Sequence, residues 1–223
     1  MTDRVRFITL EGGEGTGKST QALRLARRLE TAFGAHVVTT REPGGSPRAE
    51  YLRSLILSGA ARPFGAFAEA VLFSAARSDH IRATIAPALA RNAWVISDRF
   101  ADSTRAYQGA LGNLDTRLVA ALEGVVLEGL RPGLTLVLDM PAEEGLRRAR
   151  ERASGETLDR FESEDIDFHE GLRRAFLDIA EAEPQRIAVI DARGSEEEVA
   201  GRIWAEVCRR YGLDAAASGS RHG

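Results

Sequence analysis

The sequence predicts an α/β fold in which a parallel sheet carries helices on both faces. Five short segments rich in β-branched and other apolar residues alternate with long segments whose apolar residues recur at helical spacing. The strand-like segments are almost continuously apolar, as expected for strands buried on both faces of a sheet. Alternation of this kind predicts parallel strands joined by crossover helices.

The predicted strands are Val5–Glu11, His36–Arg41, Trp94–Asp98, Leu134–Asp139 and Arg186–Asp191. The predicted helices are rich in Ala, Leu, Arg and Glu, which favour helix formation. They are Lys18–Phe33, Ala66–Ala90, Asp115–Glu128, Ala142–Arg152, Ile166–Ala182 and Glu196–Tyr211. Residues typical of turns separate these elements at Pro43–Gly45, Arg131–Gly133 and Arg193–Ser195.

Length and composition limit the classes of protein to which the chain can belong. Its 223 residues fit one domain, since domains average about 150 residues. We expect this domain at residues 1–213, followed by a flexible tail at residues 214–223. The hydrophobic fraction of 43% supports a sizeable core. The 30 basic and 33 acidic residues leave a net charge of −3, with no broad basic field for nucleic acid or an anionic membrane.

Cysteine content and apolar runs predict the compartment. Cys208 is the single cysteine, which excludes an internal disulfide framework and fits a reducing compartment. Met1–Ile8 leads straight into the first predicted strand without the apolar region of a signal peptide. No apolar run approaches the ~20 residues of a transmembrane helix. We therefore expect a cytoplasmic protein that binds neither nucleic acid nor membranes.

The strongest motif lies between the first predicted strand and the first predicted helix. Gly12–Ser19 fits the phosphate-loop pattern G-x-x-x-x-G-K-[ST], in which backbone N–H groups and a helix N-terminus surround phosphates. Lys18, the single lysine of the chain, would neutralise phosphates, and the Ser19 hydroxyl would ligate Mg²⁺. The predicted ATP-binding residues are Gly12, Gly13, Glu14, Gly15, Thr16, Gly17, Lys18, Ser19 and Thr20. The motif alone fits switches, motors, nucleic-acid ATPases and small-molecule kinases.

Charged residues end the second and third predicted strands, where ligands of parallel sheets bind. Arg41 would point into the cleft, unless it is a solvated arginine of a Pro-Gly-Gly turn. Asp98 suits Mg²⁺ or its water shell, and Arg99 suits a second phosphate. The alternative for this pair is a salt bridge at the end of the strand.

A ring and a guanidinium share one face of the helix predicted at 66–90. Phe73 and Arg77 are four residues apart, so they could stack on a planar base and donate to its exocyclic oxygen. Packing in the core is the alternative for Phe73. Thr104, Tyr107 and Gln108 add hydroxyl and amide groups on a short helix beyond the third strand.

Arginines gather around a polar segment at about residues 153–165, which we expect to form a lid. Arg148 and Arg152 precede this segment, and Arg160 lies inside it. Arginines on a segment that closes over phosphates would stabilise transition-state charge and exclude water. The alternative is a solvated helix face with ion pairs at i,i+4 spacing.

Together these motifs resemble the thymidylate kinase family of P-loop nucleoside-monophosphate kinases. The most specific part is Arg41-Glu-Pro-Gly-Gly45, Asp98-Arg-Phe100 and Ser103-Thr-x-Ala-Tyr-Gln-Gly109, each in place after its strand. The resemblance implies phosphorylation of dTMP by ATP with Mg²⁺, and a sheet in the order 2-3-1-4-5. It also implies a homodimer packed through long helices, including the helix at 66–90.

The resemblance implies a role for each matching residue. Phe73 would stack on thymine, Arg77 would bind a base carbonyl, and Arg41 and Arg99 would hold the dTMP phosphate. Glu14 would lie near the 3′-hydroxyl, and Tyr107 would lie beneath C2′ and disfavour a ribose. Thr104 and Gln108 would complete the base pocket. The catalytic residues would be Lys18, Arg99, Arg152, Arg148 and Arg160.

One departure distinguishes subtypes of the family. Some members carry an arginine inside the phosphate loop, where this chain has Gly15. The chain therefore resembles the bacterial subtype whose lid supplies the catalytic arginine, with Arg152 as first candidate before Arg148 and Arg160. The competing hypotheses are a kinase for another small acceptor and an NTP-dependent switch or nucleic-acid ATPase. The second of these lacks the expected basic stripe.

Overall fold

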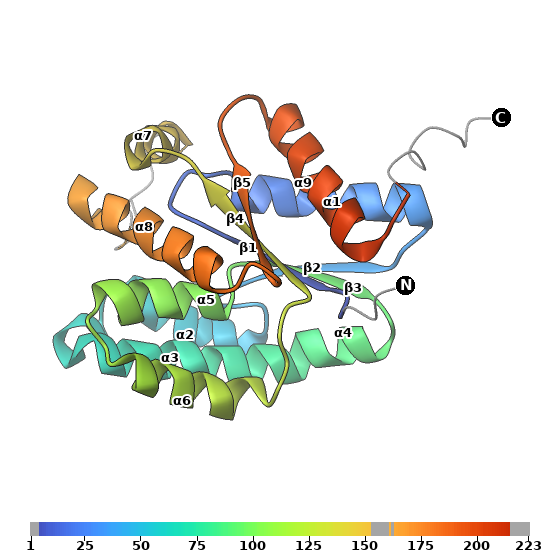
Figure 1. Ribbon diagram of the computed structural model, residues 1–223. Coiled ribbons are helices and arrows are strands. Elements are labelled where there is room, and N and C mark those ends of the chain that lie inside the picture. The colour runs from blue at the N-terminus through green and yellow to red at the C-terminus, as the bar shows by residue number, and fades with distance from the viewer. Residues whose placement is uncertain (1–4, 153–160, 162, 215–223) are drawn as a thin grey trace.

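The computed structural model describes residues 5–152, 161 and 163–214 and contains the predicted five-stranded parallel sheet (Figure 1). Its strands are β1 (Phe7–Glu11), β2 (Val37–Arg41), β3 (Trp94–Asp98), β4 (Leu134–Asp139) and β5 (Ile187–Asp191). The order is β2-β3-β1-β4-β5, and all neighbouring strands are parallel. The predicted fold class and strand order are thus confirmed.

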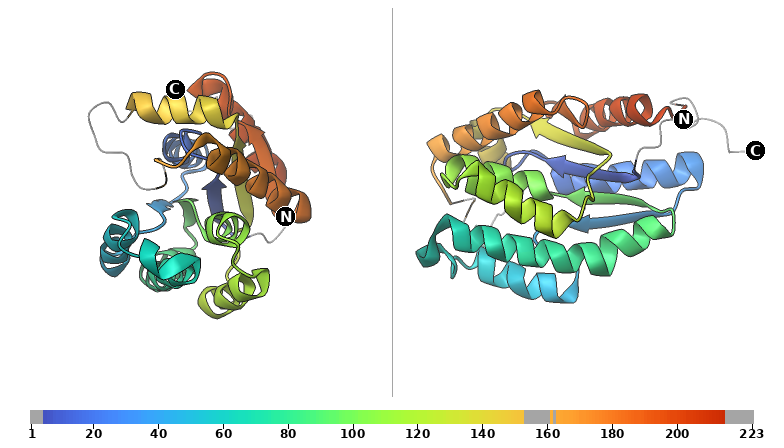
Figure 2. Two further views of the ribbon diagram at one scale, coloured as in Figure 1. Left: turned by 90° about the vertical axis from the view of Figure 1, so that its left-hand side faces the viewer. Right: turned by 60° about the horizontal axis from the view of Figure 1, so that its bottom comes forward.

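Helices cover both faces of the sheet. The α-helices in the described part of the chain are α1 (Lys18–Phe33), α2 (Pro47–Leu57), α3 (Gly65–His80), α4 (Ala86–Ala90), α5 (Ala101–Thr104), α6 (Thr116–Leu127), α7 (Ala142–Arg152), α8 (Ile166–Ala182) and α9 (Glu196–Tyr211). Helices α1 and α9 lie on one side of the sheet, and α3, α6 and α8 lie on the other (Figures 1 and 2). This arrangement leaves the carboxyl ends of the strands as the place for a ligand.

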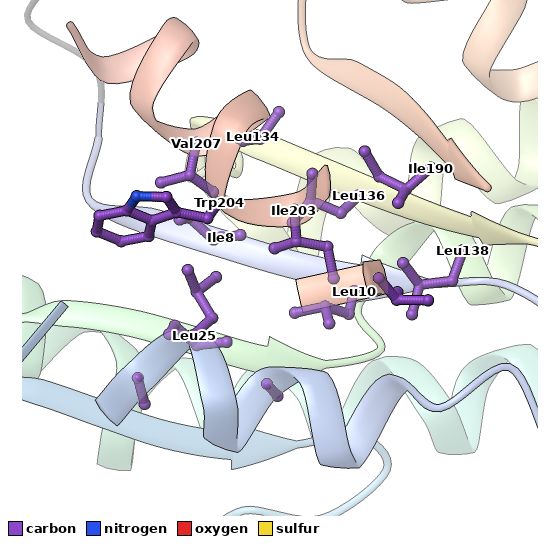
Figure 3. Packing of buried hydrophobic residues seen from close by; sticks show 14 of the residues in the cluster. Ile8, Leu10, Leu25, Leu134, Leu136, Leu138, Ile190, Ile203, Trp204 and Val207 are labelled. Carbon is purple, nitrogen blue, oxygen red and sulfur yellow. The ribbon is translucent and has the colours of Figure 1, made fainter. Parts of the chain in front are cut away.

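One hydrophobic core lies between the sheet and helices α1 and α9. Ile8 and Leu10 of β1 alternate with Phe7 and Thr9, because successive side chains of a strand point to opposite faces. Ile8 and Leu10 face Leu25 of α1 and residues of α9, among them Ile203, Trp204 and Val207 (Figure 3). Phe7 instead packs on the opposite face with Val95 of β3, with Phe100, and with residues of the helical segment at 81–90.

Burial differs between the inner and edge strands. Strands β1, β3 and β4 are buried almost throughout, as their continuous apolar sequences predict. The same prediction is wrong for β2 and β5. These strands lie at the edges of the sheet and contain exposed residues such as Val189. An apolar sequence indicates that a strand belongs to the sheet, but it does not show whether that strand lies at an edge or between two others.

Two helices differ from the prediction. The helix predicted at 66–90 ends as α-helix at His80, widens to π-helix over Ile81–Ile85 and resumes as α4. Pro87 explains the change, because it has no N–H to donate to the carbonyl four residues earlier. Helix α2 was not predicted, since it buries only Ala49 and Ile56 and has little amphipathic pattern.

No single helix among the described residues is long and apolar enough to span a membrane. Helix α2 and residues 62–90, which meet at an 80° bend, reach the required length and apolar composition only when they are taken together.

A buried ion pair joins Arg186, the residue before β5, to Asp102 of α5. Arg186 donates from both terminal nitrogens to the two oxygens of Asp102, at 2.7 and 2.9 Å. Arg105 donates to the same carboxylate at 2.9 Å. Burial disfavours the charged carboxylate, but Arg186 and Arg105 outweigh it and lower the pKa of Asp102. The carboxylate therefore remains ionised within the fold.

Removing the buried carboxylate should strongly destabilise the fold. We expect Asp102→Ala to lower the free energy of unfolding by about 3 kcal/mol, because two guanidinium groups lose their buried partner. The exposed pair of Arg147 and Glu151 is a matched control, and Arg147→Ala should cost less than about 1 kcal/mol. Urea denaturation of both variants measures the difference, and equal losses would contradict the assignment.

Candidate active site

A cleft of about 400 Å³ opens at the carboxyl ends of β1, β2 and β3. Most of the predicted site residues line it: Glu14, Gly15, Gly17, Lys18, Ser19, Thr20, Arg41, Phe73, Arg77, Asp98, Arg99, Thr104, Tyr107, Gln108 and Arg152. Gly12, Gly13 and Thr16 line a smaller cavity of about 20 Å³ between the loop, α7 and α8. Arg160 and most of the predicted lid, residues 153–160 and 162, lie outside the described residues, as does the predicted tail from residue 215.

The phosphate loop connects β1 to α1 as its motif predicts. Gly12, Gly15 and Gly17 have φ values of +131°, +69° and +88°, which side chains with a Cβ rarely adopt. Lys18 Nζ donates to the carbonyl oxygen of Gly13 at 2.6 Å. Burial and the neighbouring charge of Arg99 lower the pKa of Lys18. The ammonium group is thus held over the loop, where phosphates would be bound.

Helix α7 packs against the phosphate loop backbone to backbone. A Cβ at Gly15 would collide with the carbonyl oxygen of Gly145, and a Cβ at Gly145 would collide with the carbonyl oxygen of Glu14. The loop therefore has no room for a side chain at position 15. This contact gives a physical reason for the absence of a loop arginine in this chain.

Arg99 is held in a left-handed conformation at the end of β3, with φ at +69°. Such a conformation costs a residue with a Cβ about 1–3 kcal/mol. The guanidinium donates to Glu14 Oε1 at 2.5 Å and to the carbonyl oxygen of Gly12 at 3.1 Å. It also lies 5.3 Å from the ring centre of Tyr107. Arg99 thereby joins β3, the phosphate loop and the helical segment beyond α5.

Glu14 is a partly buried carboxylate with two donors. Tyr107 donates its hydroxyl to Glu14 Oε1 at 2.8 Å, beside the bond from Arg99. Burial alone would raise the pKa of Glu14, but the charges of Arg99 and Lys18 and the bond from Tyr107 lower it to about 2. The carboxylate is therefore ionised at neutral pH and can accept a hydrogen bond from a hydroxyl group.

Ser19 and Asp98 bring two hard oxygen donors together beside the loop. The Ser19 hydroxyl donates to Asp98 Oδ2 across the gap between α1 and β3. Within the described part of the chain, no group of three or more His, Cys, Asp or Glu side chains could hold a metal ion. A hydroxyl and one carboxylate nevertheless fit Mg²⁺, which takes most of its remaining ligands from phosphates and water.

A buried chain of hydrogen bonds fixes Arg77. Its Nε donates to Glu42 Oε2 at 2.7 Å, and its Nη2 donates to Thr104 Oγ1 at 3.0 Å and to the Phe100 carbonyl at 3.1 Å. The other oxygen of Glu42 is 2.9 Å from His80 Nδ1. Only 2% of Arg77 is exposed. Its guanidinium can therefore present few orientations to a ligand in the cleft.

Several lining residues were not predicted. Arg53 and Leu57 belong to α2, and Arg53 Nη1 donates to the carbonyl oxygen of Pro43 at 2.7 Å. Glu50 of the same helix accepts from Arg41 Nη2 at 3.2 Å. Because α2 lacks a clear apolar pattern, its sequence did not indicate that these residues reach the cleft. The one available indication was that they follow the Pro-Gly-Gly turn closely in the chain.

Aromatic side chains form one wall of the cleft. The Phe161 ring lies 5.1 Å from that of Tyr107 and 6.4 Å from that of Phe73, measured between ring centres. Phe161 lies within the predicted lid, and no role was predicted for it. A planar base could enter between this wall and the guanidinium of Arg77, since Phe73 and Arg77 both line the cleft.

The two described arginines assigned to catalysis on α7 lie in different surroundings. Arg152, the last residue of α7, lines the cleft. Arg148 donates to Glu144 Oε1 at 2.5 Å and to the carbonyl oxygen of Ala192, in the turn after β5, at 3.3 Å. The structure thus brings Arg152 to the cleft and directs Arg148 to the turn that precedes α9.

Comparisons with known proteins agree with this geometry. The thymidylate kinase family model matches residues 10–203. Thymidylate kinase of Rhodopseudomonas palustris strain TIE-1 is 56% identical over 98% of this chain and 94% of its own length. That of Bradyrhizobium diazoefficiens is 53% identical over 90% and 88%. The crystal structure of thymidylate kinase from Ehrlichia chaffeensis, 32% identical, superposes with a TM-score of 0.72 over 90% of this chain and 97% of that one. The chain belongs to the thymidylate kinase family.

Proposed function

We propose that this enzyme transfers the γ-phosphoryl group of ATP to dTMP, giving dTDP and ADP. Family membership over residues 10–203 is the observation that carries this proposal. The cleft supports it, because one end holds a phosphate loop and the other an aromatic wall with a fixed arginine. A nucleoside triphosphate and a nucleoside monophosphate can therefore meet with their phosphates between Lys18 and Arg99.

Phosphoryl transfer in this cleft depends on position and charge. A phosphate oxygen of dTMP is already anionic and attacks the γ-phosphorus in line, so no strong base is needed. Lys18, Arg99 and Arg152 neutralise charge on the transferred group, and the backbone of residues 12–17 holds the ATP phosphates. Arg148 and Arg160 remain further candidates for this role. Ser19 and Asp98 would hold Mg²⁺, which supplies charge neutralisation at the phosphate oxygens when bound.

The other end of the cleft selects the acceptor. Phe73 stacks on thymine, Arg77 donates to a base carbonyl, and Thr104 and Gln108 complete the pocket. Arg41 and Arg99 hold the dTMP phosphate. The ionised Glu14 accepts from the 3′-hydroxyl, and Tyr107 occupies the space that a 2′-hydroxyl would need. The short distances among Glu14, Arg99 and Tyr107 support this arrangement.

An exposed apolar surface supports a homodimer. Phe64, Phe67 and Val71 lie on and beside α3, with exposed fractions of 76%, 51% and 39%. They line a groove of about 460 Å³ between α2 and α3, and exposed apolar patches commonly mark interaction sites. A second copy of the chain would cover this surface through its own α3. Sedimentation velocity should then report twice the chain mass of 24.2 kDa.

We assign the enzyme to the cytoplasm. The chain has one cysteine, and Cys208 is a buried free thiol, which fits a reducing compartment. ATP and dTMP, the proposed substrates, are nucleotides of the cell interior. Cell fractionation followed by an activity assay tests this location.

A substrate panel tests the reaction directly. We expect ADP release in the presence of ATP and Mg²⁺ to be much faster with dTMP than with dUMP. Release should be slow with dCMP, dGMP or AMP, and it should stop without an acceptor or after chelation of Mg²⁺. ATP hydrolysis that is indifferent to every acceptor would contradict the kinase assignment and leave only the phosphate loop.

Phe73→Ala should weaken dTMP binding by about tenfold or more, since base–aromatic stacking contributes about 1–3 kcal/mol. Affinity for ATP should change little, because the ring lies at the acceptor end of the cleft. Titration calorimetry measures both affinities. Phe33→Ala is the control, because Phe33 stacks on Trp204 at 5.9 Å away from the cleft. Equal weakening of both ligands would make Phe73 a packing residue only.

Arg152→Ala should lower kcat by about 10²–10³ with little change in the KM for dTMP, since its charge acts on the transferred group. Steady-state kinetics with both substrates measures the split. Arg147→Ala on the same helix is the control, because Arg147 pairs with Glu151 on the exposed surface. An unchanged kcat in Arg152→Ala would remove this residue from the mechanism.

A further inference from the structure

Glu11, the last residue of β1, is a fully buried carboxylate outside the predicted site residues. Its Oε1 accepts from the backbone N–H of Phe100 at 2.7 Å and from that of Ser103 at 3.3 Å. Its Oε2 accepts from the Ser103 hydroxyl at 2.6 Å. All three of these donors belong to the short segment that begins directly after Arg99.

The backbone around Arg99 needs such support. Arg99 has a φ of +69°, and a residue with a Cβ keeps this conformation only where its surroundings enforce it. On the near side, the Arg99 N–H donates to the Leu10 carbonyl at 2.9 Å, and the Ser97 hydroxyl donates to the Arg99 carbonyl at 2.7 Å. On the far side, the N–H of the next residue, Phe100, donates to Glu11 Oε1.

Glu11 also acts on the far end of the Arg99 side chain. Arg99 Nη1 donates to the Ser103 hydroxyl oxygen at 3.3 Å, and that hydroxyl donates its own proton to Glu11. One carboxylate therefore fixes both the turn from which Arg99 departs and a partner of its guanidinium. No bond from Glu11 to the cleft is needed for either effect.

A buried carboxyl group is unfavourable at this position. Burial and the neighbouring Asp102 carboxylate raise the pKa of Glu11 to about 8, because the charged form is disfavoured where solvation is poor. An apolar side chain could pack at the end of β1 without that cost, but it could not accept from two backbone N–H groups and a hydroxyl. What Glu11 provides at this position is therefore a pair of oxygen atoms that bind the two backbone N–H groups and the Ser103 hydroxyl.

We propose that Glu11 is a positioning residue for phosphoryl transfer, which holds Arg99 at the angle needed to bind the acceptor phosphate. This inference rests on the proposed function of Arg99. Glutamine should replace glutamate well, because its carbonyl oxygen can accept both N–H bonds and the Ser103 hydroxyl can rotate to accept from the glutamine amide instead of donating. Alanine removes every acceptor.

The test compares Glu11→Ala and Glu11→Gln with the wild-type enzyme. A displacement of about 1 Å at a reacting group can cost about 100-fold in rate, and we expect Glu11→Ala to lower kcat/KM for dTMP by about that factor. The KM for ATP should stay within about twofold, and Glu11→Gln should restore most of the activity. Amide hydrogen exchange should become faster at Phe100 and Ser103 in Glu11→Ala.

Val207→Ala is the control, because Val207 of α9 is fully buried in the core on the face of the sheet opposite to Phe100. It should lower stability without changing the KM for dTMP. Ser103→Ala removes one donor and keeps the test open if Glu11→Ala does not fold; it should raise the KM for dTMP more than that for ATP. Equal effects on both substrates, or a glutamine variant as impaired as alanine, would overturn the proposal. A wild-type enzyme inactive on dTMP would instead overturn the proposed function.

Discussion

The ion pair between Arg99 and Glu14 is the interaction on which the rest of the cleft depends. It crosses from the end of β3 to the phosphate loop, and both groups are largely shielded from solvent. Neither charge could remain there alone, because an unpaired buried charge is strongly unfavourable. Under the proposed function, an acceptor phosphate bound to Arg99 would take over part of the role of Glu14. The carboxylate could then receive a sugar hydroxyl, so phosphate binding and sugar binding would support one another.

The sequence predicted the part of the site that depends on the ends of parallel strands. Arg41 and Asp98 are paired in register between β2 and β3, so the alternation of strands and helices was enough to bring them to one edge. The phosphate loop was equally local, since its glycines, Lys18 and Ser19 are consecutive. Phe73 and Arg77 could be placed on one face of a helix by their spacing. Their common position in the cleft depends on how α3 packs, which the spacing alone does not determine.

The parts that could not be predicted depend on contacts between distant segments. Arg53 reaches the cleft because α2 packs beside α3, although α2 has little amphipathic pattern. Glu42 was visible only as a turn residue, yet it holds both Arg77 and His80 in the interior. Arg148 and Arg152 lie on the same side of α7 but about 6 Å apart along its axis, and so they reach different neighbours: Arg152 lines the cleft and Arg148 bonds the turn after β5. Tertiary packing therefore determines which of these side chains reach the cleft and which reach other parts of the fold.

Paired arginines explain how a chain with a small net negative charge can bind two polyanionic nucleotides. Around the cleft, Arg41, Arg77 and Arg99 pair with Glu50, Glu42 and Glu14. These pairs offset part of the positive charge of the cleft before substrates bind, which limits repulsion among its cations. Under the proposed function, Arg77 would keep its carboxylate because it would meet a neutral base. Arg41 and Arg99 would instead meet a phosphate, whose oxygens would compete with the carboxylate for the same N–H groups. On this proposal, charge recognition works by exchange of partners within the cleft and needs no broad positive surface.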